Sequence, residues 1–233
     1  MSNLKILSLN VKGTNNVVKR KRIERFFVKE QGHILFVQET HQAKKTLKIF
    51  SYSLFKHEYS ASGTSKSRGV AIIIHPALPL QVQDIKRDVN GRYIFLNCIL
   101  NTIKITLASL YAPNLNQSQF LANTLAELQM FAVGEIIIGG DLNTTLDNHL
   151  DRKTFQQCKK PARVTFLPKL LTKYDLADSF RLINQTSKEY TFYSHSQKTY
   201  SRLDYILIST SLIHNLLDAS ISAITLSDHA PVM

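Results

Sequence analysis

The stretch EIIIGGDLNTTL, residues 135–146, is a short apolar run that ends in two glycines and then an Asp-x-Asn pair. An apolar run closed by Gly-Gly is typical of a buried strand that ends at a turn. In open α/β sheets, ligand sites lie at the carboxyl ends of strands, which is where this pair stands. The alternative is an Asx-type turn, in which Asp141 and Asn143 satisfy only local backbone groups. The stretch alone leaves both interpretations open.

The rest of the chain mixes patterns typical of strands with patterns typical of helices. Apolar or alternating runs predict strands at residues 4–9, 33–40, 68–76, 91–100, 103–113, 135–143, 189–195, 201–209 and 221–226. Helical spacing predicts helices at residues 16–29, 117–131 and 163–175, the second of them capped by Ser118. No internal repeat or Pro/Gly-rich linker is present, which favours one α/β (α+β) domain over residues 1–233, with sheets in the middle.

The composition is that of a folded, strongly basic protein. Of 233 residues, 44% are hydrophobic, and 29 Lys and Arg against 17 Asp and Glu give a net charge of +12. Such an excess favours polyanionic partners, nucleic acid or an acidic membrane surface. Cys98 and Cys158 make neither a disulfide scaffold nor a zinc-binding spacing. No signal peptide or membrane-length apolar run is present, so the chain is predicted to be soluble and intracellular.

Polar residues recur where the predicted strands end, which would bring them to one rim. An aspartate inside an apolar strand, as in SRLDYILI, is costly unless it is paired, so Asp204 needs a partner and a histidine is the natural candidate. The candidate rim residues are Asn10, Glu39, Tyr111, Asn114, Asp141, Asn143, Asp204, Asp228 and His229.

These side chains have the chemistry of metal-assisted phosphodiester hydrolysis. A carboxylate such as Glu39 binds Mg²⁺ through oxygen. Asp141 would orient and deprotonate the attacking water, while Asn143 and Tyr111 would donate hydrogen bonds to the transition state. Pairing with Asp204 would fix the tautomer of a histidine that faces the phosphate.

The segments LSLNVKG, VQET, YAPN, GGDLN, SRLDYIL and SDH occur in the order found in the exonuclease–endonuclease–phosphatase superfamily, which the chain resembles over essentially its whole length. The resemblance implies a four-layer sandwich, two packed mixed β-sheets flanked by helices, with the site at one rim. Within that superfamily, the chain is most similar to the apurinic-like endonuclease domain of non-LTR (long-interspersed-element type) retrotransposons. Two segments carry this narrower resemblance: LDRKT, which follows GGDLN, and YTFYSHSQKTYSRLDYIL.

By motif, the resemblance implies a role for each rim residue. Glu39 would bind the metal, with Asn10 and Asp228 on the same side, and Asp204 would orient His229. Tyr111 would contact the scissile phosphate. The implied DNA contacts are Asn114, Arg152, Thr191, Lys198, Tyr200 and Arg202.

Two departures separate the chain from the repair enzymes that it resembles. Lys12 stands where those enzymes often carry an acid after the first Asn, which removes one carboxylate from the metal side. The chain has no Trp to line an abasic-sugar pocket. The first departure is shared with the retrotransposon enzymes. The second, with Ser201 and Arg202 before Leu203, disfavours selective cleavage at abasic sites.

The resemblance therefore implies a Mg²⁺-dependent endonuclease, with Mn²⁺ able to substitute, that nicks one strand of duplex DNA and leaves a 3′-hydroxyl to prime reverse transcription. Met233 lies four residues beyond His229, which suggests the N-terminal part of a longer polyprotein with a covalently linked reverse transcriptase. The expected domain is monomeric, contacts no membrane and acts in the nucleus after synthesis in the cytoplasm.

Three alternatives stay open at this point: an abasic-site repair endonuclease, an inositol or lipid phosphatase of the same superfamily, and a non-catalytic nucleic-acid-binding module. The charge and LDRKT favour DNA over the phosphatase, and the presence of the acidic and histidine residues disfavours the binding module. The polar loop at 194–201 is the candidate for target choice, unless it is an ordinary solvated turn. The basic run VKRKRIERF, 18–26, is interpreted as the solvated face of the first helix rather than a nuclear address or DNA-facing patch.

Overall fold

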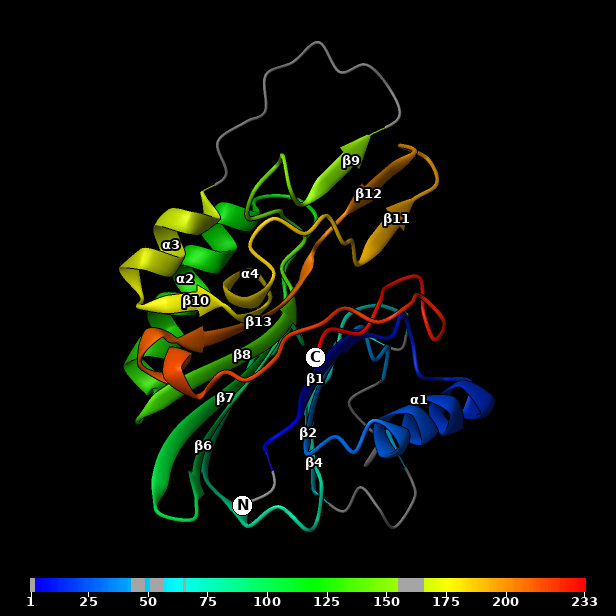
Figure 1. Cartoon of the computed structure of the whole chain (residues 1–233). Coiled ribbons are helices and arrows are strands. Elements are labelled where there is room, and N and C mark those ends of the chain that lie inside the picture. Colours follow the sequence, from blue (N-terminus) through cyan, green and yellow to red (C-terminus); the bar gives the residue numbers. More distant parts are fainter. Residues whose placement is uncertain (1–2, 43–48, 51–56, 65, 155–165) are drawn as a thin grey trace.

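The structure is a computed structural model that describes residues 3–42, 49–50, 57–64, 66–154 and 166–233. Two β-sheets pack face to face, and helices cover their outer faces (Figure 1). This is the predicted four-layer α/β sandwich.

The first sheet has four strands in the order β1-β2-β4-β3. The strands are β1 (Ile6–Asn10), β2 (Ile34–Gln38), β3 (His57–Ala61) and β4 (Val70–Ile74). β1 and β2 are parallel and the other pairs are antiparallel, so the sheet is mixed. Every residue of β2 and β4 is buried, as expected for strands covered on both faces.

The second sheet has six strands in the order β10-β13-β8-β7-β6-β5. In chain order its strands are β5 (Leu80–Arg87), β6 (Tyr93–Leu100), β7 (Ile103–Tyr111), β8 (Glu135–Asp141), β10 (Leu176–Asp178) and β13 (Asp204–Ser209). Within this sheet β7 and β8 pair in parallel, through a crossover that contains helix α2 (Gln117–Phe131).

Helices pack on both outer faces and a hydrophobic core lies between the sheets. Helix α1 (Val17–Lys29) buries Ile23 and Phe27 against the four-stranded sheet. Helices α2 and α3 (Leu167–Lys173) cover the six-stranded sheet. Two further short helical elements are α4 (Ser179–Ile183) and the 3-10 helix η2 (Thr210–Asn215). Among the described residues, no helix is long and apolar enough to span a membrane.

A third, three-stranded sheet stands at one end of the sandwich (Figure 1). It consists of β9 (Arg152–Thr154), β11 (Phe192–Ser194) and β12 (Thr199–Ser201), and we refer to it as the small sheet. The two flanking strand runs, 189–195 and 201–209, predict a hairpin from the sequence; a hairpin is present, but its second strand is β12 and its turn spans 195–198. The prediction that 201–209 forms that strand was wrong, because β13 pairs with β8 instead.

Two further local predictions were wrong. Residues 221–226 form no strand: Ile221 makes one isolated bridge to Val232, and 223–225 are exposed. Helix α2 begins directly after Asn116, two residues earlier than a Ser118 cap requires. The predicted helix at 163–175 is present from Leu167, while 163–165 lie outside the described residues.

Candidate active site

Strand register places three of the predicted rim residues in one row. Tyr111 of β7 pairs with Asp141 of β8, and Asp141 pairs with Asp204 of β13. In the other sheet, Asn10 ends β1 and Glu39 directly follows β2. The ends of the two sheets meet at the rim, where Nδ2 of Asn10 lies 2.8 Å from Oδ2 of Asp141.

His229 joins this row from the C-terminal segment. Its Nδ1 lies 2.8 Å from Oδ2 of Asp204, and its Nε2 points toward Oδ2 of Asp141 at 3.9 Å. The ring of Phe192 lies beside the imidazole, with centroids 4.7 Å apart. The side-chain hydroxyl of Thr191 accepts hydrogen bonds from the backbone N–H groups of Leu203 and Asp204. The predicted contact between Asp204 and a histidine is thus present, with both side chains buried.

The electrostatics of this row suit proton transfer near neutral pH. Burial and the charge of Asp204 raise the pKa of Asp141 to about 7, against the opposing effects of His229 and of the hydrogen bond from Asn10. Burial alone would lower the pKa of His229, but the charge and hydrogen bond of Asp204, with smaller effects of Asp141 and Asp228, raise it to about 9. At pH 7 the imidazole is therefore charged, and Asp141 can take up or release a proton.

Asn10 connects the acids of the two sheets. Its Nδ2 donates to Oε1 of Glu39 at 2.9 Å and to Oδ2 of Asp141 at 2.8 Å, while its Oδ1 accepts from the backbone N–H of Lys12. Asn143 orients the other oxygen of Asp141, because its backbone N–H donates to Oδ1 at 2.9 Å. Asp141 is thereby held with both oxygens bonded and one edge toward His229.

Glu39 accepts hydrogen bonds from two further side chains. Nε2 of His41 lies 3.1 Å from Oε2, and the phenol of Tyr111 also bonds to Glu39. Burial, followed by the charge of Glu39, raises the pKa of Tyr111, which keeps the phenol a hydrogen-bond donor. The sequence places His41 close behind Glu39, which indicates that it can approach the site, but the local motif assigns it no role; the structure shows its contact with Glu39.

Left-handed backbone conformations gather at this rim, where a side chain normally disfavours them. Such strain persists where the surrounding structure fixes it and is concentrated at functional sites. Four non-glycine residues of the rim have φ between 44° and 53°: Lys12, Glu39, His41 and Asn143.

Asp228 lies at the exposed side of the site and forms an ion pair with Lys12. Nζ of Lys12 is 2.6 Å from Oδ2 of Asp228, and both side chains are partly exposed, at 61% and 35%. The negative charge of Glu39 also helps to raise the pKa of Lys12, after the larger effect of the hydrogen bond to Asp228. The residue that replaces the expected acid therefore places its own positive charge beside the predicted metal ligands.

The described residues offer two sets of possible metal ligands. Asp141, Asp204 and His229 each have a ligand atom within 4.8 Å of the others. In that set, Asp204 and His229 already bond to each other. Glu39 and Asp228 also have hydrogen-bond or ion-pair partners, but their side chains are 20% and 35% exposed, so their carboxylate oxygens are the more accessible ones for a hydrated ion.

The predicted DNA-contacting residues divide into an exposed and a buried group. Asn114, Arg152 and Lys198 are exposed, the last two on the small sheet. Tyr200 is half-buried and packs against Tyr193, with ring centroids 4.5 Å apart. Thr191 is fully buried and supports Asp204, so the structure gives it a positioning contact in place of the predicted phosphate contact.

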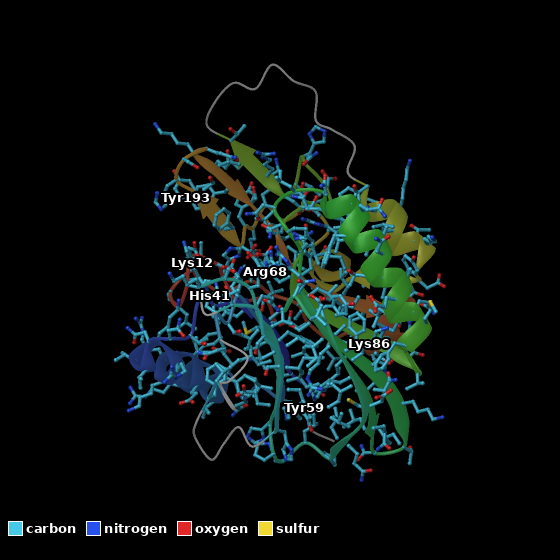
Figure 2. All side chains as sticks on the ribbon, turned by 180° about the vertical axis from the view of Figure 1, so that it is seen from behind. Lys12, His41, Tyr59, Arg68, Lys86 and Tyr193 are labelled. Carbon is cyan, nitrogen blue, oxygen red and sulfur yellow. The ribbon has the colours of Figure 1, made fainter. Side chains whose placement is uncertain are left out.

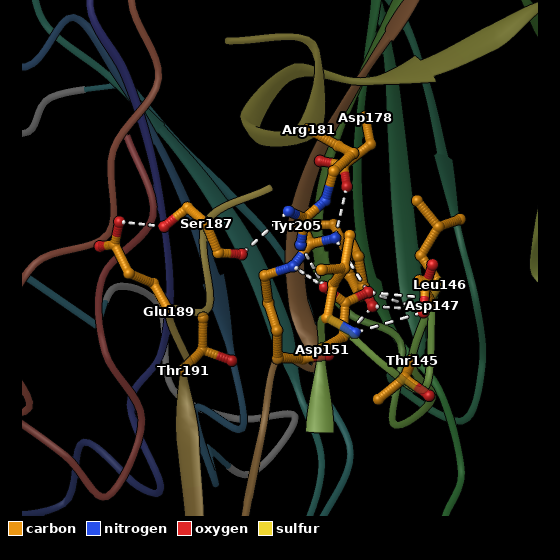
Figure 3. A network of polar contacts seen from close by, with 12 residues as sticks. Thr145, Leu146, Asp147, Asp151, Asp178, Arg181, Ser187, Glu189, Thr191 and Tyr205 are labelled. Atoms are coloured by element: carbon orange, nitrogen blue, oxygen red, sulfur yellow. Dashed lines mark hydrogen bonds and ion pairs between the residues drawn. The ribbon is translucent and has the colours of Figure 1, made fainter. Parts of the chain in front are cut away.

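The prediction that Arg202 contacts DNA was wrong. Its side chain is fully buried, and it bonds to both oxygens of Asp151, at 2.8 and 3.1 Å, and to Asp178 at 2.6 Å. Arg181 approaches the same carboxylate of Asp151 at 2.5 Å (Figure 3). We call Asp151, Asp178, Arg181 and Arg202 the buried ionic network. It connects the start of β9 to α4 and to the segment before β13.

A profile of the Endonuclease/Exonuclease/phosphatase family matches residues 7–229. The chain is 25% identical over 231 residues to the transposon TX1 uncharacterized 149 kDa protein of Xenopus laevis, a match that includes 97% of this chain. It spans only 17% of the length of that relative. It is 27% identical over 259 residues to the DNA repair nuclease APEX1 of Danio rerio, with 99% of this chain and 81% of the relative covered.

Solved structures share the fold. An AP endonuclease from Archaeoglobus fulgidus has a TM-score of 0.77 and 20% identity, covering 98% of this chain and 97% of that one. The AP endonuclease LMAP from Leishmania major has a TM-score of 0.80 and 17% identity, covering 98% and 86%. The family profile matches nearly the whole chain, and the rim holds Asp141, Asp204 and His229, which we call the acid–histidine row. The chain therefore belongs to the endonuclease/exonuclease/phosphatase family and is a phosphoester hydrolase.

Proposed function

We propose that the chain is a DNA endonuclease that nicks one strand of intact duplex DNA and leaves a 3′-hydroxyl that can prime reverse transcription. The observation that carries the proposal is the row of Asp141, His229 and Asp204, in which an aspartate with a raised pKa faces a charged imidazole held by a second, buried aspartate. The net charge of +12 and the 25% identity to a transposon protein support a DNA substrate and a transposon context.

In this proposal Asp141 is the general base. It accepts one proton of the attacking water, whose oxygen forms a bond to phosphorus as the bond from phosphorus to the 3′-oxygen breaks. The products are a 5′-phosphate and a 3′-oxygen that takes up a proton to become the hydroxyl. A base with a pKa near 7 suits this step, because a large fraction is deprotonated at the operating pH and the carboxylate still binds a proton readily.

The neighbouring side chains stabilise the charge that develops on the phosphate. The imidazolium of His229 faces the reacting group, and Asp204 keeps its ring oriented. The Tyr111 phenol is positioned to donate once substrate competes with Glu39 for it. Mg²⁺, bound by oxygens of Glu39 and Asp228 beside Asn10, would neutralise charge on the phosphate and on the leaving oxygen.

The product end provides a direct test of the proposal. Undamaged supercoiled plasmid is incubated with Mg²⁺ and either the wild-type protein or Asp141→Asn, and the nicked circles are given to a DNA polymerase without any end treatment. Nicks made by the wild-type protein alone, and extended by the polymerase, are the expected result. Nicks that cannot be extended would exclude a priming function, and an equally active variant would exclude the site.

Abasic-site repair is the second candidate, favoured by the 27% identity to the repair nuclease APEX1. The chain has no Trp, and Arg202 beside β13 is buried in the ionic network and inaccessible to a sugar pocket. Matched oligonucleotide duplexes with and without one abasic site separate the two functions. Both duplexes should be nicked at comparable rates, whereas a repair enzyme would cut only the abasic duplex.

The wider setting is also part of the proposal. The match to 17% of a 149 kDa transposon protein supports a longer protein, and we propose that a covalently linked reverse transcriptase is part of it. Such a protein would act on nuclear DNA after synthesis in the cytoplasm, and the domain would work as a monomer. Nuclear imaging of the tagged full-length protein tests the location, and a mass measured in solution tests the oligomeric state.

A further inference from the structure

Two arginines, Arg68 and Arg92, lie together in turns that the site described above does not use. Arg68 precedes β4 and Arg92 precedes β6. The backbone N–H of Gly69 donates to the carbonyl of Gly91 at 3.0 Å, which joins the two turns directly. The charge of Arg68 contributes, after burial, to a lowered pKa of Arg92, so the two guanidinium groups are close enough to repel each other.

Both turns contact the active site. The carbonyl of Arg68 accepts from the backbone N–H of His41, two residues after Glu39, at 2.8 Å. Figure 2 labels Arg68 and His41 in the same part of the molecule. The guanidinium of Arg92 stacks on the ring of Tyr111, with Cζ 4.9 Å from the centroid, and donates to the carbonyls of Tyr111 and Ala112. The pair therefore flanks Glu39 and Tyr111, whereas the small sheet flanks His229 through the Phe192 bridge.

Neither guanidinium forms an ion pair with a carboxylate within the described residues. The nearby Asp88 uses a carboxylate oxygen to accept the backbone N–H of Arg92, at 2.8 Å. Two adjacent positive charges held by tight backbone packing, without an acid between them, attract an anion with several oxygens. A phosphate presents such oxygens, and arginine matches its geometry in two-point hydrogen bonds.

We propose that Arg68 and Arg92 bind a backbone phosphate of the DNA substrate that lies beside the scissile phosphate, on the Glu39 side of the site. Arg68 makes the direct contact from the partly exposed rim, and Arg92 completes the positive site while supporting the Tyr111 ring. The inference rests on the proposed function, since it takes duplex DNA as the substrate. It adds a second anchor for the duplex, across the site from the small sheet.

Binding to DNA in EDTA tests the inference without cleavage. Affinity for an undamaged duplex oligonucleotide is measured by fluorescence anisotropy over a series of salt concentrations. Arg68→Gln removes the charge and leaves an L side chain at the same left-handed φ of 64°. We expect roughly tenfold weaker binding at low salt, because a charge-assisted hydrogen bond to the phosphate is removed. The slope of log affinity against log salt should fall by about 0.9, because the variant neutralises one phosphate fewer.

Lys104→Gln is the matched control. Lys104 is exposed on β7, the strand that carries Tyr111, but stands seven residues away, or about 23 Å along the strand. The Lys104→Gln substitution removes the same unit of charge from the far end of the sandwich. It should change neither the affinity for the duplex nor the slope of log affinity against log salt. If Arg68→Gln behaved like Lys104→Gln, the inference would be overturned.

A scan of the duplex with single neutral methylphosphonates locates the contact. One position should weaken binding of the wild-type protein and have little effect on Arg68→Gln, because the neutralised phosphate and the replaced arginine belong to one interaction. Equal effects on both proteins at every position would overturn the inference. A wild-type protein that neither binds nor nicks duplex DNA would refute the proposed function itself, whereas normal nicking with an unchanged Arg68→Gln refutes only the phosphate site.

Discussion

The described residues include two pairs of buried aspartates, and their partners give them opposite roles. Asp151 and Asp178 are faced by Arg181 and Arg202, so two negative charges meet two positive ones. Asp141 and Asp204 are faced by one cationic partner among the described residues, His229. A guanidinium stays charged at every physiological pH, so Arg181 and Arg202 keep two positive charges in the network. The charged imidazole of His229 supplies only one positive charge to two aspartates, and the pKa of Asp141, raised to about 7, lets that acid take up a proton near neutral pH.

Burial of an acid does not by itself indicate catalysis, as the two pairs show. The carboxylate of Asp151 accepts from two arginines and from the backbone N–H groups of Leu146 and Asp147, which leaves it no free direction for a substrate. Asp141 keeps an edge toward His229 and the rim. A buried acid with a raised pKa, such as Asp141, indicates a site of chemistry, whereas a buried acid whose oxygens are all bonded, such as Asp151, holds parts of the fold together.

The largest expected effect comes from removing the charge of Asp141. Asp141→Asn keeps the size of the side chain but abolishes the general base, so nicking of supercoiled plasmid should fall by about 10³-fold. The free energy of unfolding should stay within about 1 kcal/mol of the wild-type value, because the buried carboxylate with a raised pKa is replaced by a neutral group. Urea unfolding measures this second quantity. A strongly destabilised variant would place Asp141 with the structural acids.

The buried ionic network should show the reverse behaviour. Asp151→Asn leaves two arginines without their carboxylate, and we expect a loss of about 3–5 kcal/mol in the free energy of unfolding. Nicking per folded molecule, measured below the unfolding transition, should remain within a few-fold of wild type. Asp84→Asn, at an exposed acid of β5, is the control for loss of one negative charge. Stable but inactive Asp151→Asn protein would remove the distinction between the two clusters.

Much of the fold and the row at the rim could be predicted from the sequence, because the signals were local. Apolar runs marked the central strands, and an aspartate at the start of the apolar stretch of β13 indicated the need for a partner such as His229. Arg202 was assigned to DNA because its partner Asp151 is 51 residues away, and no local pattern links them. The turns that bring Arg68 to Arg92 were equally hidden, since their join is a backbone hydrogen bond.

The short and exposed strands explain most of the missed structure. The strands β3, β5, β9, β10 and β12 were not predicted. β5 and β9 have no buried residue, and β3 and β12 have one each, so the apolar pattern of a strand is weak there. Conversely, the alternating residues 221–226 looked like a strand, but the described part of the chain provides no neighbouring strand for them. Strand formation there depends on a partner supplied by the fold, which periodicity does not report.

A smaller effect is expected in the pH dependence of stability without divalent metal. The pKa of His229 is raised to about 9 in the folded protein, against 6.5 when unfolded, so its stabilising contribution is complete below pH 6.5 and is lost as the pH rises through 9. The full contribution is at most about 3 kcal/mol. Urea unfolding in EDTA at pH 6 and pH 9.5 should show the stability difference between wild type and His229→Gln shrinking toward the higher pH. A difference that is independent of pH would mean that the imidazole is not charged in the folded state.

The smallest effect on total activity is expected at the small sheet, where the charges are exposed and face solvent. The turn at 195–198, with Lys198 at a left-handed φ of 46°, joins β11 to β12 at the end of the sandwich beside the site. Replacing these four residues by Asn-Gly keeps a tight hairpin while removing the protruding side chains. Because this turn contributes nothing to the acid–histidine row, the overall nicking rate should change by less than about threefold. If the turn recognises the shape of a DNA groove, the positions of the nicks should shift. Mapping nicks on one end-labelled duplex measures both quantities, and an unchanged pattern would mean that target choice lies elsewhere, with the arginine pair the next region to alter.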